Sequence, residues 1–349
     1  MILVTGGSGF IGSHLVHLLV SEGRPVRVLD LQAPASSGRC DAQYIRGDVT
    51  DPSAVARALR RVSAVCHLAA KVGMGRDMLD VADYARQNDL GTATLVRHLA
   101  QSGFRGRLVL AGSMVVYGEG AYRCPVHGHV SAAPRDCAQL ADGRFEPRCR
   151  CGRELRPTAV DESAPLDPRS VYAATKVHQE HLCFAFSRET GIPVTALRYH
   201  NVYGPGMPRD TPYAGVASIF ASQIASGRPA QVFEDGKQLR DFVHVRDVAR
   251  ASVIALTCPD PQRGAFNIAS GTPRTVLEMA RALTRATGAQ APEPRVTGQF
   301  RLGDVRHVYA SARRASEVLG FRAREDFDHG LAELSRDLAA ARAAQPVAS

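Results

Sequence analysis

Three side chains in the middle of the sequence have the types and spacing of an acid–base site. Tyr172 and Lys176 stand four residues apart in Val-Tyr-Ala-Ala-Thr-Lys, and Ser113 lies upstream in Gly-Ser-Met-Val-Val-Tyr-Gly. Positions i and i+4 share one face of a helix, so the Lys176 ammonium can sit beneath the Tyr172 phenol. A nearby cation is expected to lower the pKa of Tyr172 from its ordinary value of about 10. The pattern predicts a phenolate that removes the proton of a substrate hydroxyl, while Ser113 donates a hydrogen bond to the oxygen of that hydroxyl.

The first residues of the chain predict a nucleotide-binding loop. An apolar run of β-forming residues ends at a glycine cluster over 6–12, and helical periodicity follows over 13–20. Gly6 permits the turn, Gly9 lets the backbone approach a pyrophosphate, and Gly12 allows the helix to pack closely on the strand. The free amide groups of the helix N-terminus would face the phosphates. Because the spacing is Gly-x-x-Gly-x-x-Gly rather than Gly-x-Gly-x-x-Gly, the loop taken alone leaves an ordinary turn as an alternative.

Acidic or small residues follow the next predicted strands. A strand over 26–30 ends in Asp30, whose carboxylate can accept both ribose hydroxyls of an adenosine and would repel a 2′-phosphate. The predicted cofactor is therefore NAD rather than NADP. Asp48 follows a third strand, where it either contacts the adenine amino group or caps the next helix. A fourth strand over 64–70 ends in residues small enough for a dinucleotide to approach, and we interpret His67 within it as a packed strand residue.

These features resemble the extended short-chain dehydrogenase/reductases, specifically the NAD-dependent nucleotide-sugar epimerases and dehydratases. Further matching segments follow in family order over nearly the whole chain: Asn88 with Gly91-Thr92, Ser113 to Gly118, Leu197 to Pro205, Glu234 to Phe242, Phe266-Asn267-Ile268 and Gly303 to Arg306. Within the family, the chain is most similar to dTDP-L-rhamnose 4-epimerases, with UDP-glucuronate 4-epimerases second. The nucleotide base and the sugar stay open.

The resemblance implies an α/β fold: a Rossmann doubly wound parallel sheet, a smaller C-terminal substrate-binding lobe and a cysteine-bearing insertion. The 349 residues are enough for both parts. The NAD-binding domain is expected over 1–176, with the insertion at 119–160. Residues 177–349 form mainly the substrate lobe, with segments around 192–204 and 241–257 returning to the first domain.

The same resemblance implies the site residues. Tyr172 is the base, Lys176 binds the nicotinamide ribose, and Ser113 hydrogen-bonds the reacting sugar oxygen. The residues expected to contact NAD are Gly6, Gly9, Phe10, Ile11, Gly12, Asp30, Asp48, Val49, Leu68, Ala69, Ala70, Asn88, Tyr172, Lys176, Tyr199 and Val202. The residues expected to bind a nucleotide-diphosphate sugar are Ser113, Tyr172, Asn201, Arg240, Arg301 and Asp304.

Physical arguments support the arginines among these residues. Arg240 and Arg301 are forked donors suited to bidentate phosphate contacts, and Asp304 can bind a ribose hydroxyl. Arg306 is either another phosphate ligand or a surface residue. His200, at a position that is usually aromatic in relatives, is expected to pack rather than to contact the sugar.

Two positions after Ser113 discriminate between reactions. The 4,6-dehydratases that this chain resembles have an acid and base pair there to eliminate water, and the decarboxylases have a glutamate at the second position. Here the residues are Met114 and Val115, which cannot transfer protons. The expected reaction is 4-epimerisation, in which bound NAD oxidises C4 and returns the hydride to the opposite face. A dehydratase, decarboxylase or reductase, or a non-catalytic NAD-binding protein, are the alternatives.

Bulk properties predict a cytoplasmic enzyme without nucleic-acid or membrane partners. The net charge is +9, but the arginines are spread along the chain with no basic run or aromatic stacking motif. No apolar stretch approaches the length of a membrane span, and the first strand leaves no room for a signal peptide. Relatives pair the helix around 91–101 with the Tyr172 helix across a two-fold interface, so we expect a homodimer.

Four of the eight cysteines fall in the expected insertion. Cys124 and His127 form Cys-x-x-His, and Cys149 and Cys151 precede a glycine, which together predict a structural zinc site. Free thiols are the alternative, because a disulfide is disfavoured in a reducing compartment. Some nucleotide-sugar 4-epimerases are similar here, but they have Cys-x-x-Cys where this chain has Cys149-Arg150-Cys151.

Overall fold

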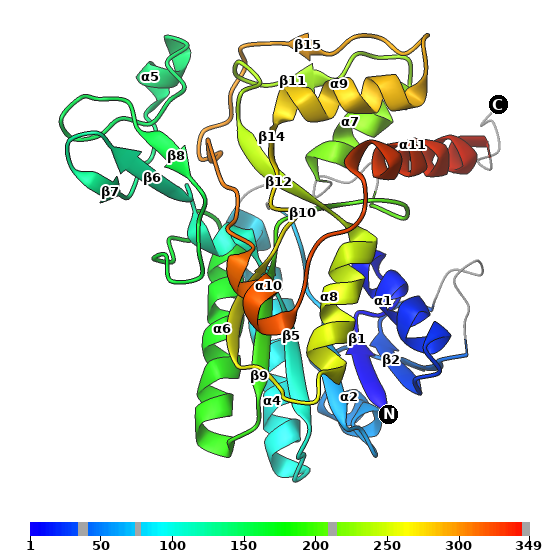
Figure 1. Cartoon of the computed structure of the whole chain (residues 1–349). Coiled ribbons are helices and arrows are strands. Elements are labelled where there is room, and N and C mark those ends of the chain that lie inside the picture. Colours follow the sequence, from blue (N-terminus) through cyan, green and yellow to red (C-terminus); the bar gives the residue numbers. More distant parts are fainter. Residues whose placement is uncertain (34–40, 74–77, 209–214, 344–349) are drawn as a thin grey trace.

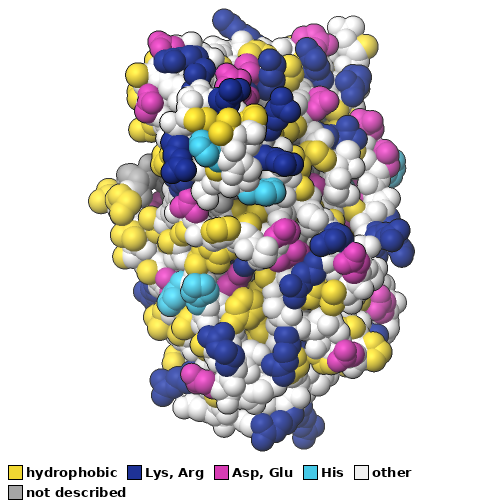
Figure 2. All heavy atoms as spheres, turned by 60° about the vertical axis from the view of Figure 1, so that its left-hand side comes forward, with side chains coloured by type: hydrophobic (Ala, Val, Ile, Leu, Met, Phe, Trp, Pro, Cys, Tyr) yellow, Lys and Arg dark blue, Asp and Glu magenta, His cyan; other side chains and the backbone are white. Residues whose placement is uncertain are grey.

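The structure of the chain is a computed structural model that describes residues 1–33, 41–73, 78–208 and 215–343, with the backbone alone at 341–343. Cys40 and Pro212-Tyr213-Ala214 lie outside the described residues. In the described part of the chain, no helix combines the length and apolar character needed to cross a membrane. On the face shown in Figure 2, basic and acidic side chains are interspersed.

A seven-stranded parallel sheet forms the lower half of the molecule in Figure 1. In spatial order its strands are β3 (Gln43–Arg46), β2 (Val26–Asp30), β1 (Ile2–Thr5), β4 (Ala64–His67), β5 (Arg107–Ser113), β9 (Val194–Tyr199) and β13 (Gly264–Ile268). The direction of winding reverses between β1 and β4, the switch point at which such sheets bind dinucleotides. The predicted Rossmann sheet is confirmed.

Helices cover both faces of this sheet. One face carries α1 (Phe10–Ser21), α8 (Val245–Thr257) and α10 (Arg313–Leu319). The other carries α2 (Pro52–Ala58), α4 (Gly91–Gln101) and α6 (Val171–Thr190). Between β4 and α4 lie the short helical turns η2 (Met78–Asp80), α3 (Val81–Tyr84) and the π-helical η3 (Ala85–Leu90). Both faces of every central strand are therefore buried, as a parallel sheet requires.

A smaller lobe lies above the carboxyl ends of the strands (Figure 1). Its strands are β10 (Asn201–Tyr203), β12 (Leu239–His244) and β14 (Pro273–Thr275), with the pair β11 (Gln231–Val232) and β15 (Arg295–Val296). Its helices α7 (Val216–Ala225), α9 (Val276–Thr287) and α11 (Phe327–Ala343) enclose a separate apolar core. The chain enters this lobe after β9 and returns to the main sheet with α8 and β13.

Residues 119–160, here called the cysteine segment, project beside the small lobe (Figure 1). The segment contains β6 (Ala121–Cys124), β7 (Gly128–Val130), α5 (Cys137–Ala141) and β8 (Arg156–Thr158), and its three strands form an antiparallel sheet. A small core of Tyr122, Cys124, Ala132, Cys149 and Leu155 holds it together. It leaves the main sheet after η4 (Met114–Tyr117), directly behind Ser113, and the chain then reaches α6.

Candidate active site

The glycine loop that joins β1 to α1 leaves little space for side chains. A Cβ at Gly12 would lie 2.1 Å from the carbonyl oxygen of Gly6, far inside van der Waals contact. Gly6 itself has φ +72°, and a Cβ there would lie 2.7 Å from the backbone nitrogen of Ala69. At Gly9 the nearest atom would be 3.4 Å away, which is ordinary contact. Gly6 and Gly12 are therefore required by packing, whereas packing alone would admit a side chain at Gly9.

Asp30 faces the loop from the end of β2. Its carboxylate accepts hydrogen bonds from the backbone N–H groups of Ser8 and Gln32, both at 3.0 Å. This places an acceptor beside the loop, where the sequence predicted a ribose contact. Asp48 accepts from the backbone N–H of Thr50, and Asp51 caps α2. The alternative that Asp48 is the helix cap is therefore wrong.

The predicted catalytic side chains come together above β5. Ser113 ends β5, and its hydroxyl lies near enough to the Tyr172 phenol to favour the phenolate. Ser170 caps α6 by accepting from the backbone N–H of Ala173, so Tyr172 lies in the first turn of this helix and Lys176 in the second. The Lys176 ammonium donates to the carbonyl oxygen of Ala111 at 3.0 Å.

The prediction that Lys176 lowers the pKa of Tyr172 is wrong for the protein alone. Burial raises the pKa of the Tyr172 phenol to about 12, and the Ser113 hydroxyl offsets only part of that rise. Burial also lowers the pKa of Lys176 to about 8, although Glu180 favours its charged form. Desolvation outweighs the cation because Lys176 Nζ lies 5.9 Å from the centre of the Tyr172 ring and turns toward Ala111.

Several residues around this triad were not predicted. Tyr84 is fully buried, with its ring centre 6.1 Å from that of Tyr172. One turn beyond Lys176, Glu180 forms a buried bidentate ion pair with Arg198 of β9. The Lys-x-x-x-Glu spacing was a usable signal for Glu180, since i and i+4 share a helix face. The partner Arg198 is set by strand placement and had no local signal.

A buried polar network joins the glycine strand to the catalytic helix. His67 contacts the Thr5 hydroxyl at 2.7 Å through Nδ1 and the Thr92 hydroxyl at 3.0 Å through Nε2. Thr92 donates its only hydroxyl proton to the carbonyl oxygen of Asn88, so Nε2 of His67 must carry the ring proton. Gln179 of α6 also donates to Thr92. His67 is confirmed as a packed strand residue, and it fastens two parts of the site together.

Asn88 is completely buried and links three elements. Its side chain accepts from the backbone N–H of Lys71 at 2.7 Å and donates to the carbonyl of Lys71 and to the Thr175 hydroxyl. Thr175 in turn donates to the carbonyl oxygen of Tyr172. The Asn88 amide is therefore occupied by the protein, and its effect on a cofactor would come through the position of Tyr172.

The other predicted cofactor residues border the switch point in different ways. Ala69, next to Leu68 and Ala70, donates its backbone N–H to the Thr5 hydroxyl. Gly91 of α4 lies against Val49, which is buried. Ile11 and Val202 pack on the main core, and Phe10 packs on the core of the small lobe. Tyr199 points away from Tyr172, because its hydroxyl contacts Ser252 of α8 at 2.8 Å.

The predicted substrate residues lie on the small lobe or at its edge. The side-chain oxygen of Asn201 is buried and has no hydrogen-bond partner among the described residues. Arg301 is exposed and stacks over the Phe233 ring at 5.1 Å. Burial raises the pKa of Asp304, whose carboxylate hydrogen-bonds no described residue. Arg240 donates to the carbonyl oxygens of residues 239, 305 and 306, so much of its donor capacity is already used.

Both expectations for Arg306 are wrong, because it is neither a surface residue nor free to bind phosphate. Its side chain is fully buried and contacts the carboxylates of Glu146, Glu234 and Asp235 at 2.6–3.0 Å. His200 is buried, and burial lowers its pKa to about 3. The expectation that His200 packs is confirmed.

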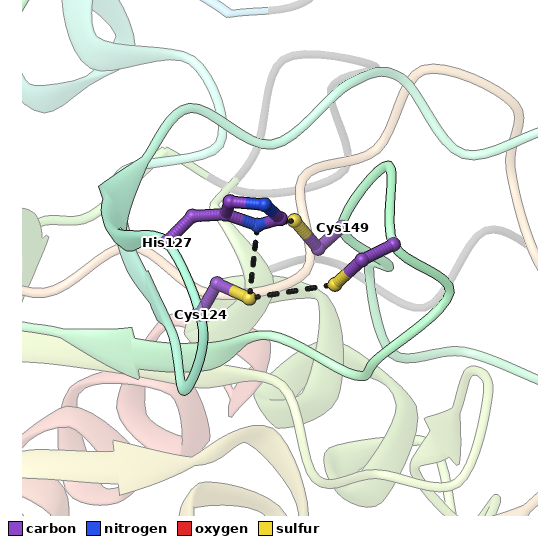
Figure 3. A group of neighbouring side chains, drawn as sticks. Cys124, His127 and Cys149 are labelled. Carbon is purple, nitrogen blue, oxygen red and sulfur yellow. Dashed lines mark hydrogen bonds between the residues drawn. The ribbon is translucent and has the colours of Figure 1, made fainter.

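The four predicted metal ligands converge at one end of the cysteine segment. The ligand atoms of Cys124, His127, Cys149 and Cys151 all lie within 4.8 Å of one another. Cys124 Sγ is 3.6 Å from His127 Nδ1 and 3.7 Å from Cys151 Sγ, and His127 Nδ1 is 3.2 Å from Cys149 Sγ. Figure 3 shows the labelled Cys124, His127 and Cys149 turned toward one another. Cys137 lies outside this cluster and is exposed.

Comparisons with known proteins agree with this architecture. The profile of the NAD dependent epimerase/dehydratase family matches residues 2–136 and 150–269, which leaves out part of the cysteine segment. A dTDP-L-rhamnose 4-epimerase of Burkholderia thailandensis is 33% identical over 344 residues, covering 95% of this chain and 93% of that protein. The UDP-glucose 4-epimerase of Thermus thermophilus in complex with NAD has a TM-score of 0.77 and 29% identity, over 99% of both chains. The UDP-glucose 4-epimerase of Thermotoga maritima with UDP-glucose has a TM-score of 0.80 and 29% identity, over 98% of this chain and 99% of that one.

Proposed function

Since the chain belongs to the NAD-dependent epimerase/dehydratase family, we propose that it is a nucleotide-sugar 4-epimerase that keeps NAD bound. The observation that carries this function is the approach of the Ser113 hydroxyl to the Tyr172 phenol beside a buried Lys176, above the carboxyl end of β5. Relatives named as 4-epimerases align over nearly the whole chain.

The loop and Asp30 fit an adenine dinucleotide. The two crowded glycines bring the β1–α1 backbone into a tight turn whose amide groups can face a pyrophosphate. Asp30 lies within reach of this turn, because it accepts from Ser8 inside the loop. A carboxylate there suits the two ribose hydroxyls of NAD and repels the 2′-phosphate of NADP.

The residues of the triad divide the proton chemistry among them. NAD, when bound, would accept a hydride from C4 of the sugar and return it to the opposite face. The Tyr172 oxygen removes the proton of the C4 hydroxyl. Ser113 donates a hydrogen bond to the C4 oxygen as negative charge develops on it. Lys176 supplies a positive charge below the phenol, and Glu180 favours that charge. Neither Met114 nor Val115, which follow Ser113 in η4, carries a group that could eliminate water.

The small lobe supplies the groups for the nucleotide diphosphate. The buried oxygen of Asn201 and the carboxylate of Asp304, which hydrogen-bond no residue in the described part of the chain, can accept from hydroxyl or amide donors of the substrate. Arg301 keeps an exposed guanidinium for phosphate. Arg240 stays close to Asp304 and contributes charge, although carbonyl oxygens occupy its terminal nitrogens.

The cysteine cluster fits a structural zinc ion. In a tetrahedral site with Zn–S of about 2.3 Å and Zn–N of about 2.0 Å, neighbouring ligand atoms lie about 3.5–3.8 Å apart. Three of the observed separations, 3.2–3.7 Å, are close to these edges, and all four ligand atoms lie within 4.8 Å of one another. The short Cys149-Arg150-Cys151 spacing is accommodated by a tight turn in which Gly152 donates its N–H to the carbonyl of Cys149. With four protein ligands and no open position, the metal would be structural.

A homodimer fits the outer surface of α4 and α6, which lie side by side (Figure 1). Leu90, at the end of η3, and Val81, at the start of α3, are 51% and 41% exposed, although large apolar side chains are usually covered. The Leu90→Glu substitution is therefore expected to yield monomers in sedimentation velocity at micromolar concentration. A monomeric native protein under the same conditions would remove the basis for this interface.

Native mass spectrometry combined with an epimerisation assay tests the function. We expect one NAD per chain in freshly purified protein and interconversion of C4 epimers, measured by product chromatography, with no external NAD added. Tyr172→Phe provides the matched control, because it removes one oxygen and should keep the cofactor. Net consumption of NAD(H), or a product that has lost water, would instead assign a reductase or a dehydratase.

A further inference from the structure

Arg135, in the cysteine segment, is buried against the nucleotide side of the proposed site. Its side chain is only 2% exposed. One terminal nitrogen donates to the carbonyl oxygen of Phe145 at 3.1 Å and contacts the Glu234 carboxylate at 2.9 Å. The other donates to the carbonyl oxygen of Asp304 at 2.7 Å. A single guanidinium thus connects the cysteine segment, the small lobe and the backbone of a proposed substrate residue.

A second buried arginine continues the connection from the other side. Arg306, two residues after Asp304, pairs with Glu146 of the cysteine segment and with Glu234 and Asp235 of the small lobe. Glu119, at the start of the cysteine segment, accepts the backbone N–H of Arg306 at 2.7 Å. Burial would raise the pKa of Glu146, but His307 and Arg306 outweigh it and lower that pKa to about 2. Glu146 therefore stays charged and holds Arg306 near neutral pH.

Buried ionic contacts add to the apolar packing at this junction, where Val160 of the cysteine segment shares an apolar cluster with Val305 and Val308. A cavity of about 630 Å³ opens next to the ion pairs of Arg306. It is bordered by Glu146 and Leu155 of the cysteine segment and by His307. Buried charged pairs of this kind are costly to break, because removing one partner leaves the other desolvated and unpaired. The stretch from Asp304 to His307 is therefore held in one position partly by groups that the cysteine segment supplies.

We propose that Arg135 is a positioning residue for nucleotide binding, through which the cysteine segment sets the place of Asp304. This inference rests on the proposed function, in which Asp304 binds the nucleoside diphosphate part of the substrate. Arg135 does not touch the sugar or the triad, and it acts by holding the Asp304 carbonyl so that the adjoining carboxylate faces the site. The cysteine segment then completes the nucleotide side of the site.

The test compares Arg135→Met and Arg135→Lys with the control Arg144→Met. Arg144 belongs to the same segment but is exposed and paired only with Asp142 among the described residues. For Arg135→Met we expect KM for the nucleotide sugar to rise about tenfold or more, as for loss of a charge-assisted hydrogen bond. The kcat value and the bound NAD should stay within about twofold of the native protein, because the triad is untouched. Arg135→Lys keeps the charge but not the forked pair of donors. Its KM should therefore lie between those of the native protein and Arg135→Met.

Binding of UDP and dTDP to the NAD-loaded protein, measured by calorimetry, separates this inference from the proposed function. A native protein that binds these nucleotides but turns over no sugar would overturn the epimerase proposal alone, and the Arg135 variants would still be compared by affinity. Unchanged nucleotide affinity in Arg135→Met would overturn the inference. So would a parallel loss of kcat, NAD and affinity in both Arg135 variants, which marks a general structural role. If Arg135→Met does not fold, the Lys variant decides by the same criteria.

Discussion

The Lys176 ammonium lies 5.9 Å from the centre of the Tyr172 ring and donates to the main chain of β5 instead of the phenol. Lys176 is buried and Tyr172 is half-buried, and desolvation disfavours the charged form of each: the pKa of Tyr172 rises to about 12 and that of Lys176 falls to about 8. The protein alone therefore holds a neutral phenol beside a cation that is close to losing its proton. Bound substrate and the positive charge of oxidised NAD would have to supply the remaining bias toward phenolate.

This pairing predicts how the rate depends on pH. The pKa of Lys176 is lowered, so its charge is present below about 8 and disappears as the pH rises through that value. Turnover should therefore decline above about pH 8, because the phenolate loses its cation. Lys176→Arg, whose guanidinium stays charged, should be slower but lack this declining limb, as measured by kcat over pH 6–10. A decline that persists unchanged in the Arg variant would assign it to another group.

Tyr172→Phe removes the phenolic oxygen and keeps the ring that packs against Tyr84. We expect a fall in kcat of about 10³-fold or more, since general base catalysis supplies effects of this order. Retained NAD, counted by native mass spectrometry, should be unchanged. A variant that kept a tenth of the native rate would show that another group is the base.

Two glycine substitutions should separate packing from cofactor binding. Gly9 has φ −77°, and an added Cβ would make only ordinary contact, so Gly9→Ala should fold normally and lose NAD affinity by about tenfold or more. Gly12→Ala should lose both stability and NAD, because its Cβ collides with the Gly6 carbonyl. Melting temperature and NAD content of the two variants give the comparison. Full NAD retention in Gly9→Ala would mean that the pyrophosphate does not approach this residue.

Loss of one cluster ligand should loosen the cysteine segment. Cys124→Ser is expected to contain well under one zinc per chain by elemental analysis and to melt about 5 °C or more below the native protein. Activity should fall with it, since the segment joins Ser113 to α6. Cys137→Ser is the matched control, being exposed in the same segment and outside the cluster. Native protein without zinc, together with fully active Cys124→Ser, would reduce these cysteines to loop residues.

Buried histidines predict sensitivity to acid. Burial lowers the pKa of His67 to about 3, so its contribution to stability is complete above its unfolded value near 6.5 and is lost progressively as the pH falls toward 3. Below pH 6.5, each such histidine should lower the free energy of unfolding by about 1.4 kcal/mol per pH unit. His67→Gln should reduce the dependence of the unfolding free energy on pH by the equivalent of one proton, about 1.4 kcal/mol per pH unit, in denaturant titrations between pH 7 and 5. An unchanged slope in His67→Gln would show that His67 does not stay neutral in the folded protein.

The sequence by itself determined the parts of the site that depend on local geometry. These parts are the glycine spacing, the acid at the end of the second strand and the Tyr172–Lys176 interval. Each depends on contacts within one turn or one strand–turn–helix unit. The structure reproduces these contacts because their geometry is set by a few neighbouring residues. The cysteine cluster was predictable for the same reason, since each half is a short turn with its own ligands.

Only the tertiary structure decided what burial and distant partners do to these groups. The pKa of Tyr172 rises rather than falls because the packing of β5 and α6 removes its water, which no spacing in the sequence reports. Arg306 is neither a phosphate ligand nor a surface residue because Glu146 and Glu234, distant in sequence, meet it in the interior. Long-range packing sets which charges are desolvated and which carboxylates reach them. These electrostatic roles therefore emerge only when the lobes and the cysteine segment are assembled.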